Sequence, residues 1–199
     1  MKILITLLIT TLSLSFNAKA QSNLAYNNCE LKPIAIGEKI PDQIWNRNFA
    51  IINHPNPISF MKLSQFGNKL IILDLWATNC HPCIESLDLM DSLSKSFKDD
   101  LVVIPVLMND RIEKAHPFMI KKGYKWPCIV GDTTIGLDMM KNYSFSGGTI
   151  WIKDGKLLAA PLKQSVTAEN IRKAINGEPI NFALRKLLRK KIAEKELKP

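Results

Sequence analysis

Two cysteines three positions apart, Cys80 and Cys83, carry the clearest chemical signal of this sequence. A Cys-x-x-Cys pair that opens a helix can exchange disulfides, because the N–H groups and partial positive charge of a helix start stabilise a thiolate. The thiolate is the nucleophile of this reaction. We therefore expect Cys80, at the exposed edge of the helix, to attack a disulfide. Cys83, one turn further in, would then resolve the mixed disulfide.

A zinc site or a purely structural bridge would account for the cysteine pair less well. Half of a zinc site would need two more ligands, and Cys29, Cys128 and the three histidines form no second close pair. A structural bridge closing so short a loop would add little stability on the loop-entropy argument. The sequence therefore predicts a redox-active disulfide with no metal and no cofactor.

The flanking segments predict how the pair is held. Residues 70–76 form a short, almost continuous apolar run, which is typical of a central strand covered on both faces. Pro82 fits the first turn of a following helix. That helix would present one apolar face, whose residues recur at three- and four-residue steps: Leu87, Met90, Leu93 and Phe97.

The rest of the chain alternates between strand and helix patterns. We expect a strand and turn in residues 58–66, strands over 101–106, 149–153 and 156–160, and helices over 111–122 and 135–143. Pro117 would kink the first of these helices or delay its start. Asp154-Gly155 predicts a hairpin turn. Thr167 would cap a last helix that ends at Gly177. This order predicts an α/β fold with a central sheet and helices on both faces.

The amino terminus has the pattern of a secretory signal peptide. Lys2 precedes the apolar residues 3–16, and Ala18-Lys19-Ala20 supplies small residues at the cleavage positions. An apolar run of this length is too short to span a bilayer. We expect residues 1–20 to be removed, residues 21–36 to form a lead-in and the mature protein to be periplasmic.

The net charge of +9 is concentrated at the carboxyl end. Residues 184–199 hold seven basic and two acidic side chains, so this tail is strongly basic while the remaining body is close to neutral. Nucleic-acid binding would require basic residues across a folded surface, so we expect none. Residues 179–199 form the predicted tail. Its segment 182–197 is a candidate amphipathic helix that could lie on an anionic membrane, bind a partner or pack on the domain.

The segment from Asp74 to Cys83, Asp-Leu-Trp-Ala-Thr-Asn-Cys-His-Pro-Cys, resembles the active-site motif of the thioredoxin superfamily. Residues 37–42, residues 67–69 and the signal peptide make it similar to the periplasmic TlpA/ResA-type proteins. The resemblance covers residues 37–178. It implies a thioredoxin-like fold with a mixed sheet. It also implies exchange with protein thiols and disulfides, an upstream redox partner and a part in cell redox homeostasis.

The resemblance also implies roles for neighbours of the pair. Asp74 matches a buried carboxylate whose raised pKa would let it take the proton of Cys83. The alternative to this catalytic role is an aspartate at the strand end that faces water. Trp76 matches an active-site tryptophan, although a core aromatic fits the pattern equally well. His81, beside Pro82, would stabilise the thiolate if protonated, or would be a solvent-exposed residue with little effect.

Two departures from the family pattern stand out. A loop proline facing the cysteines, just before a Thr and a strand, is replaced here by Gly147 or Gly148 ahead of Thr149. We expect the more flexible glycine loop to weaken the docking of peptide disulfides. The glutamate usual three positions after the second cysteine is replaced by Ser86, which puts the proton-transfer role of that position in doubt.

Three questions stay open at the level of sequence. Cys29 and Cys128 could form a second disulfide in an oxidising compartment or remain two buried thiols. The chain could be a binding module that has lost catalysis, although both active-site cysteines are present. A peroxide reductase is a third option, but the Pro expected ahead of its reactive cysteine is absent.

Overall fold

The computed structural model describes residues 32–54, 60–141, 143 and 148–180. The predicted signal peptide, most of the lead-in, Cys29, Gly147 and the basic tail from residue 181 lie outside these residues. The helices and strands follow one another in this order: α1 (Asp42–Trp45), β1 (Phe49–Ile52), β2 (Phe60–Met61), the 3-10 helix η1 (Leu63–Phe66), β3 (Leu70–Trp76), α2 (His81–Ser94), β4 (Leu101–Leu107), α3 (Ile112–Lys122), β5 (Cys128–Ile129), the π-helix η2 (Thr134–Met139), β6 (Gly148–Lys153), β7 (Lys156–Ala159), the 3-10 helix η3 (Lys163–Ser165) and α4 (Ala168–Asn176).

The strands form one mixed sheet in the order β2-β1-β5-β4-β3-β6-β7. β3 lies near its middle, parallel to β4 over the whole strand and antiparallel to β6. In this register Asp74 stands opposite Pro105 of β4 on one side and Thr149 of β6 on the other. The register therefore places Asp74 deep inside the sheet.

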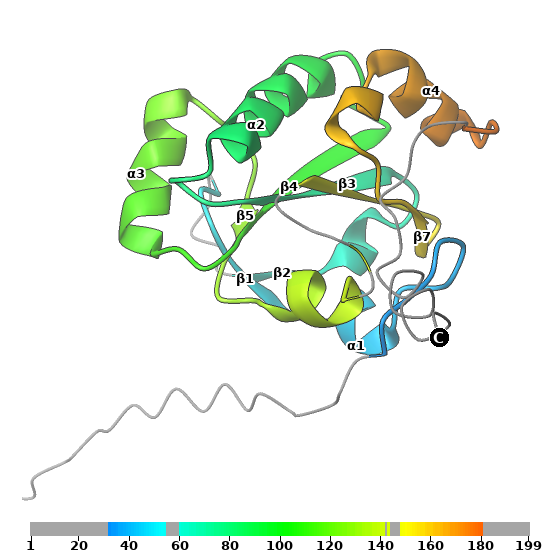
Figure 1. Ribbon diagram of the computed structural model, residues 1–199, viewed down its shortest axis with the longest axis horizontal. Helices are drawn as coiled ribbons and strands as arrows, with labels where there is room; N and C mark the ends of the chain where they lie inside the picture. Colours follow the sequence, from blue (N-terminus) through cyan, green and yellow to red (C-terminus); the bar gives the residue numbers. More distant parts are fainter. Residues whose placement is uncertain (1–31, 55–59, 142, 144–147, 181–199) are drawn as a thin grey trace, which may run out of the picture.

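Alternate residues of β3 face two different cores, one on each face of the sheet, and helices lie on both faces (Figure 1). Ile71, Leu73 and Leu75 pack with residues of α1, η1 and η2 on one face of the sheet. Leu70 and Ile72 pack on the other face with residues of α2 and α4. All seven residues of the strand are buried, because both faces are covered. The predicted α/β class, a central mixed sheet with helices on both faces, is confirmed.

Local sequence signals predicted several elements correctly. The helix after Cys80 is α2, with Pro82 in its first turn and Leu87 and Met90 fully buried. The Thr167 hydroxyl accepts the Asn170 N–H at the start of α4. The turn at Asp154-Gly155 has positive φ at both residues, as a two-residue hairpin requires.

Other predictions were inaccurate. The helix expected over 135–143 is instead the six-residue π-helix η2, whose start is fixed by Asp132 accepting the Ile135 N–H. α3 starts at Ile112 and continues through Pro117, so a late start is wrong. The strand expected in residues 58–66 is only β2, which is followed by η1. The elements α1, β1 and β5 had not been predicted from periodicity.

No helix among the described ranges is long and apolar enough to cross a membrane. The predicted membrane or partner contact of residues 182–197 lies outside those ranges and stays a prediction.

The packing of α2 leads to a prediction about stability. Leu87 is fully buried among residues of β4, α3 and the segment around β5, including Leu107, Met119 and Val130. Leu87→Ala should lower the free energy of unfolding by about 2–5 kcal/mol, because it leaves a cavity under α2. Denaturant unfolding measures this value. Leu137→Ala, at a side chain that is 53% exposed, is the matched control and should cost far less. Equal losses would contradict this packing.

Candidate active site

Cys80 and Cys83 form a disulfide at the junction between β3 and α2. The chain leaves the sheet after Trp76, and the Cys80 N–H donates to the Ala77 carbonyl in the connecting turn. Cys80 is the N-cap of α2, and its carbonyl accepts from the N–H groups of Cys83 and Ile84 at 3.0 Å each. The two cysteine Cα atoms are 5.2 Å apart.

The two sulfur-bearing residues differ in burial as the sequence predicts. Cys83 is only 4% exposed and packs with Trp76 and Leu87 on the inner side of the helix. Cys80 is partly exposed, and its neighbours His81 and Pro82 are exposed. A partner disulfide can therefore approach Cys80 from solvent, whereas Cys83 offers little surface to a protein partner.

Asp74 is completely buried on the α2 side of β3. One carboxylate oxygen, Oδ2, accepts a hydrogen bond of 2.8 Å from the Ser86 hydroxyl. The other, Oδ1, has no hydrogen-bond partner within the described part of the chain. Burial raises the pKa of Asp74 to about 7, partly offset by the Ser86 hydrogen bond, which lowers it. The alternative of an aspartate facing water is wrong.

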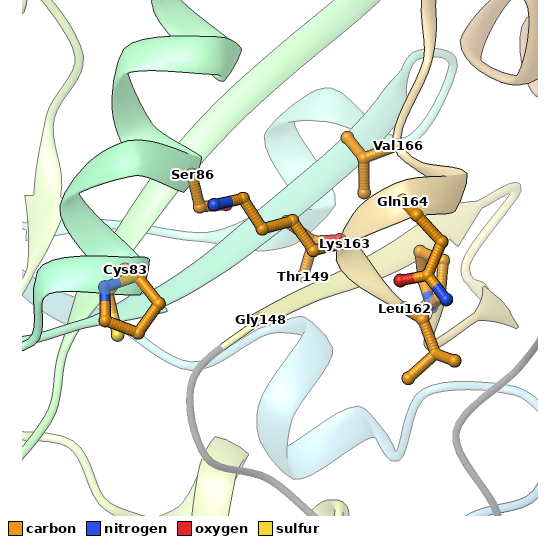
Figure 2. A pocket seen from close by; sticks show the side chains of 10 residues that line it. Cys83, Ser86, Gly148, Thr149, Leu162, Lys163, Gln164 and Val166 are labelled. Atoms are coloured by element: carbon orange, nitrogen blue, oxygen red, sulfur yellow. The ribbon is translucent and has the colours of Figure 1, made fainter.

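A pocket of about 280 Å³ lies beside the disulfide (Figure 2). Its walls come from the start of α2, the start of β6 and the segment between β7 and α4; they are formed by Pro82, Cys83, Ser86, Gly148, Thr149, Pro161, Leu162, Lys163, Gln164 and Val166. The pocket thus opens Cys83 and Ser86 to a small group or to water.

The start of β6 stands where the resemblance implies a loop proline. Gly148 has φ +134°, a value that proline cannot adopt because its ring fixes φ near −65°. Thr149 is buried, and its Oγ1 accepts the Trp151 indole N–H. If the family proline corresponds to Gly148, the backbone here must follow a different path from a proline-bearing loop. Gly147 lies outside the described residues.

The charged groups at the rim of the pocket come from two distant segments. His81 is 86% exposed, and its Nε2 lies 3.3 Å from Glu85 Oε1. Glu85 also pairs with Lys163 Nζ, which reaches across from the segment after β7 towards α2 (Figure 2). The hydrogen bond and charge of Lys163 lower the pKa of Glu85. The predicted effect of His81 on the thiolate therefore has to compete with a neighbouring carboxylate.

Trp76 is a core residue. It is 1% exposed, its ring lies 5.7 Å from that of Phe118, and its indole N–H donates to Cys128 Sγ at 3.4 Å. Cys128 is a free, fully buried thiol whose pKa is raised to about 12 by burial. Its predicted partner, Cys29, lies outside the described residues.

Sequence reasoning missed two contributors to the site. Ser86 was noted only as a departure from the family pattern, yet its hydroxyl holds Asp74; its spacing of one helical turn from Cys83 could have placed it on the same face. Lys163 is 78 residues from Glu85 in sequence, and no local signal brings it to the pocket.

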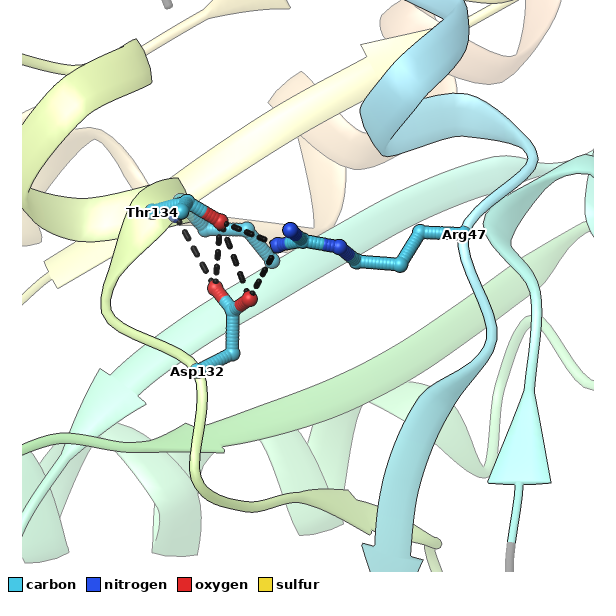
Figure 3. A network of polar contacts seen from close by, with 4 residues as sticks. Arg47, Asp132 and Thr134 are labelled. Carbon is cyan, nitrogen blue, oxygen red and sulfur yellow. Dashed lines mark hydrogen bonds and ion pairs between the residues drawn. The ribbon is translucent and has the colours of Figure 1, made fainter. Parts of the chain in front are cut away.

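A second polar cluster stabilises the other face of the sheet (Figure 3). Arg47, after α1, donates to Asp132 and Thr134 at 2.7 Å each, and the Thr134 hydroxyl lies 2.9 Å from the Asp132 carboxylate. This cluster connects α1 to η2, so its role is structural. Within residues 32–180, apart from the gaps given above, no cluster of metal-binding side chains occurs.

Comparison with solved structures shows which fold carries this site. The thioredoxin domain of a thiol-disulfide oxidoreductase from Bacteroides vulgatus superposes with a TM-score of 0.58 at 18% identity, over 72% of this chain and 99% of that one. A thiol:disulfide interchange protein from Bacteroides sp. gives 0.57 at 18%, over 72% and 92%. A secreted disulfide oxidoreductase from Mycobacterium tuberculosis gives 0.53 at 8%, over 69% and 99%.

The chain has the thioredoxin-like fold. This confirms the fold that the motif around Cys80 and Cys83 predicted. No family model matches the sequence. No curated protein matches it either.

The raised pKa of Asp74 leads to a prediction about pH. Between the usual aspartate pKa of 3.8 and the folded value of about 7, the folded oxidised protein binds a proton that the unfolded chain has released. Its free energy of unfolding therefore falls as the pH rises through this window. Asp74→Asn cannot ionise. The variant should gain on the order of 4 kcal/mol relative to the parent between about pH 4 and pH 8.

Urea unfolding of the oxidised proteins at the two pH values measures this difference. Asp99→Asn, at an exposed aspartate, is the matched control and should follow the parent. A stability difference between Asp74→Asn and the parent that does not change with pH would show that Asp74 titrates normally.

Proposed function

We propose that the chain is an exported thiol–disulfide oxidoreductase that exchanges electrons with protein disulfides through Cys80 and Cys83. The observation that carries the proposal is the disulfide at the start of α2, with one cysteine accessible and the other buried. The thioredoxin-like fold supports it, since the structural neighbours from Bacteroides are named as thiol-disulfide exchange proteins.

The proposed reaction has two steps. The Cys80 thiolate attacks a partner disulfide, forms a mixed disulfide and releases one partner thiolate, which takes a proton from solvent. Cys83 then loses its proton and attacks Cys80 Sγ. This step re-forms the Cys80–Cys83 bond and releases the second partner thiolate. Two electrons pass to the partner, and the reverse sequence oxidises a partner dithiol.

Asp74 is the proposed proton acceptor for Cys83 in the second step. Its carboxyl is buried on the same side of β3 as α2, and a pKa of about 7 makes it an effective base near neutral pH. Cys80 lies at the solvent side and needs no such acceptor for the first step. The roles of Trp76 and His81 are secondary in this proposal, because one is in the core and the other is exposed.

Export and partner class belong to the same proposal. The apolar residues 3–16 and the Ala18-Lys19-Ala20 segment support a cleavable signal and a periplasmic location. The secreted Mycobacterium tuberculosis protein of the same fold is consistent with it. In an oxidising compartment the partners would be proteins with exposed disulfides or dithiols, together with an upstream protein that restores the redox state of Cys80 and Cys83.

The function can be tested with an insulin-reduction assay. The mature chain should accelerate the reduction of insulin by a small thiol, and Cys80→Ser should abolish the acceleration. Cys83→Ser should instead accumulate a mixed disulfide through Cys80, because the resolving thiol is missing. Mass spectrometry of the trapped adduct identifies the attacking residue. No acceleration by the parent would favour a binding module or a peroxide reductase, and adducts on Cys83 would reverse the assignment.

The role of Asp74 gives a separate kinetic prediction. Asp74→Asn should slow release of the second partner thiolate by at least about tenfold near neutral pH, while formation of the mixed disulfide changes little. The measurement is a stopped-flow reaction of the reduced protein with an aromatic disulfide whose thiolate product absorbs visible light. The absorbance trace separates release of the first thiolate from release of the second. All proteins carry Cys29→Ser so that this thiol does not contribute. Asp99→Asn is the control. Unchanged release in Asp74→Asn would remove Asp74 from the mechanism.

A further inference from the structure

Ser86 occupies the interface between the pocket and the buried carboxyl. It lies one helical turn after Cys83 on the inner face of α2 and is 7% exposed. Its hydroxyl donates to Asp74 Oδ2 at 2.8 Å. Ser86 and Cys83 both line the pocket (Figure 2), whereas Asp74 does not. Within the described chain, Ser86 is thus the pocket side chain that contacts Asp74 through a hydrogen bond.

Only one oxygen of the Asp74 carboxyl has a hydrogen-bond partner among the described residues. Ser86 fixes Oδ2, while Oδ1 is buried without a hydrogen-bond partner among the described residues. Its cross-strand neighbours are Pro105 and Thr149, and neither donates a described hydrogen bond to the carboxyl. A buried carboxylate with so few donors is costly to ionise, so the hydroxyl of Ser86 is the main local group that favours the charged form.

We propose that Ser86 both holds Asp74 in place and relays the proton of Cys83 to it. The inference rests on the proposed function and adds a residue to it. As Cys83 attacks Cys80, its thiol proton moves to the Ser86 oxygen through one pocket water, and the Ser86 hydroxyl proton moves to Asp74 Oδ2. The Cys83–Cys80 bond forms, the bond to the partner breaks, and Asp74 becomes neutral. The reverse transfer returns the proton when the disulfide is reduced.

The charged side chains that flank Ser86 on α2 are paired with other groups. On α2, Glu85 pairs with Lys163, and Asp88 accepts from Lys122 and from the Tyr124 hydroxyl. The pKa of Asp74 responds to burial and to Ser86, in that order. In the other direction, Asp74 contributes to raising the pKa of Tyr124, but less than burial and Asp88 do. Besides these groups, the thiol of Cys83 in the reduced protein is the titratable group of α2 that shares the pocket with Ser86.

The proposal predicts a pH profile as well as a rate. The rate of release of the second partner thiolate should rise with pH as Asp74 ionises, and the midpoint of this rise should lie near the pKa of Asp74. Without the Ser86 hydrogen bond the pKa of Asp74 rises further. Ser86→Ala should therefore slow the second release about tenfold at neutral pH and move its midpoint to higher pH, with the first release unchanged. The stopped-flow assay described above, repeated across pH in the Cys29→Ser background, measures the rates of the first and second releases and the pH midpoint of the second.

Two variants separate a proton-transfer role from a packing role. Ser86→Thr keeps the hydroxyl and should restore the parent rate and midpoint. Ser92→Ala makes the same change at an exposed serine of α2 and should have no effect. A Ser86→Ala protein that is slower by the same factor at every pH, or a Ser86→Thr protein that is not restored, would overturn the proposal.

The outcome also distinguishes this inference from the proposed function. If Asp74→Asn is slow and Ser86→Ala matches the parent in rate and midpoint, the function stands and the role of Ser86 is wrong. If Asp74→Asn itself is unaffected, the proton acceptor is misassigned and the inference falls with it. Carbon NMR of the Asp74 carboxyl gives a second measurement should Ser86→Ala be too unstable for kinetics: Ser86→Thr must leave its titration close to that of the parent, and a large shift would overturn the proposal.

Discussion

The burial of one carboxyl group in the centre of the sheet constrains the rest of the site. Asp74 is completely buried between β4 and β6, and the one donor that contacts it through a described hydrogen bond is Ser86 of α2. For Ser86 to reach Asp74, α2 must start at a fixed height above β3 and present a fixed face to it. That same placement turns Cys83 inward and leaves Cys80 at the exposed end. The cysteine pair and its proposed proton acceptor are therefore positioned by one packing arrangement, which Leu87 and Met90 stabilise.

Exposure to solvent decides which charged groups can tune the site. The side chains of the two exposed ion pairs, His81 with Glu85 and Glu85 with Lys163, are between about half and nine-tenths exposed, so water and salt screen them. Asp74 has no such screening, and burial moves its pKa from 3.8 to about 7. We therefore expect the pH dependence of the site to come mainly from the Asp74 carboxyl and its Ser86 partner. The exposed ion pairs should change this pH dependence only slightly.

The elements that position the chemistry could be predicted from sequence because their signals are local. The apolar run of β3, the apolar spacing of α2 and the capping hydroxyl of Thr167 each depend on residues within a few positions. β1 and β5 were missed because they are four and two residues long and exist through their pairing, Ile51 with Ile129. The sequence predicts a longer helix in place of η2, since nothing in its apolar pattern reveals that the Asp132 carboxylate fixes its first turn. The pocket wall from Pro161 to Val166 depends on tertiary contacts and gives no local pattern.

A carboxyl whose pKa lies near neutral pH can work in both directions of the proposed exchange. As a carboxylate it accepts the proton of Cys83 when the protein reduces a partner; as a neutral acid it returns that proton when the protein oxidises one. Both forms are present close to pH 7, so in the proposed reaction Asp74 would speed both directions and favour neither. The direction of electron flow must then follow from the difference in reduction potential between the Cys80–Cys83 pair and its partner. On the protein side, that potential depends on the relative stability of the Cys80 thiolate, to which we expect the N–H groups at the exposed start of α2 to contribute.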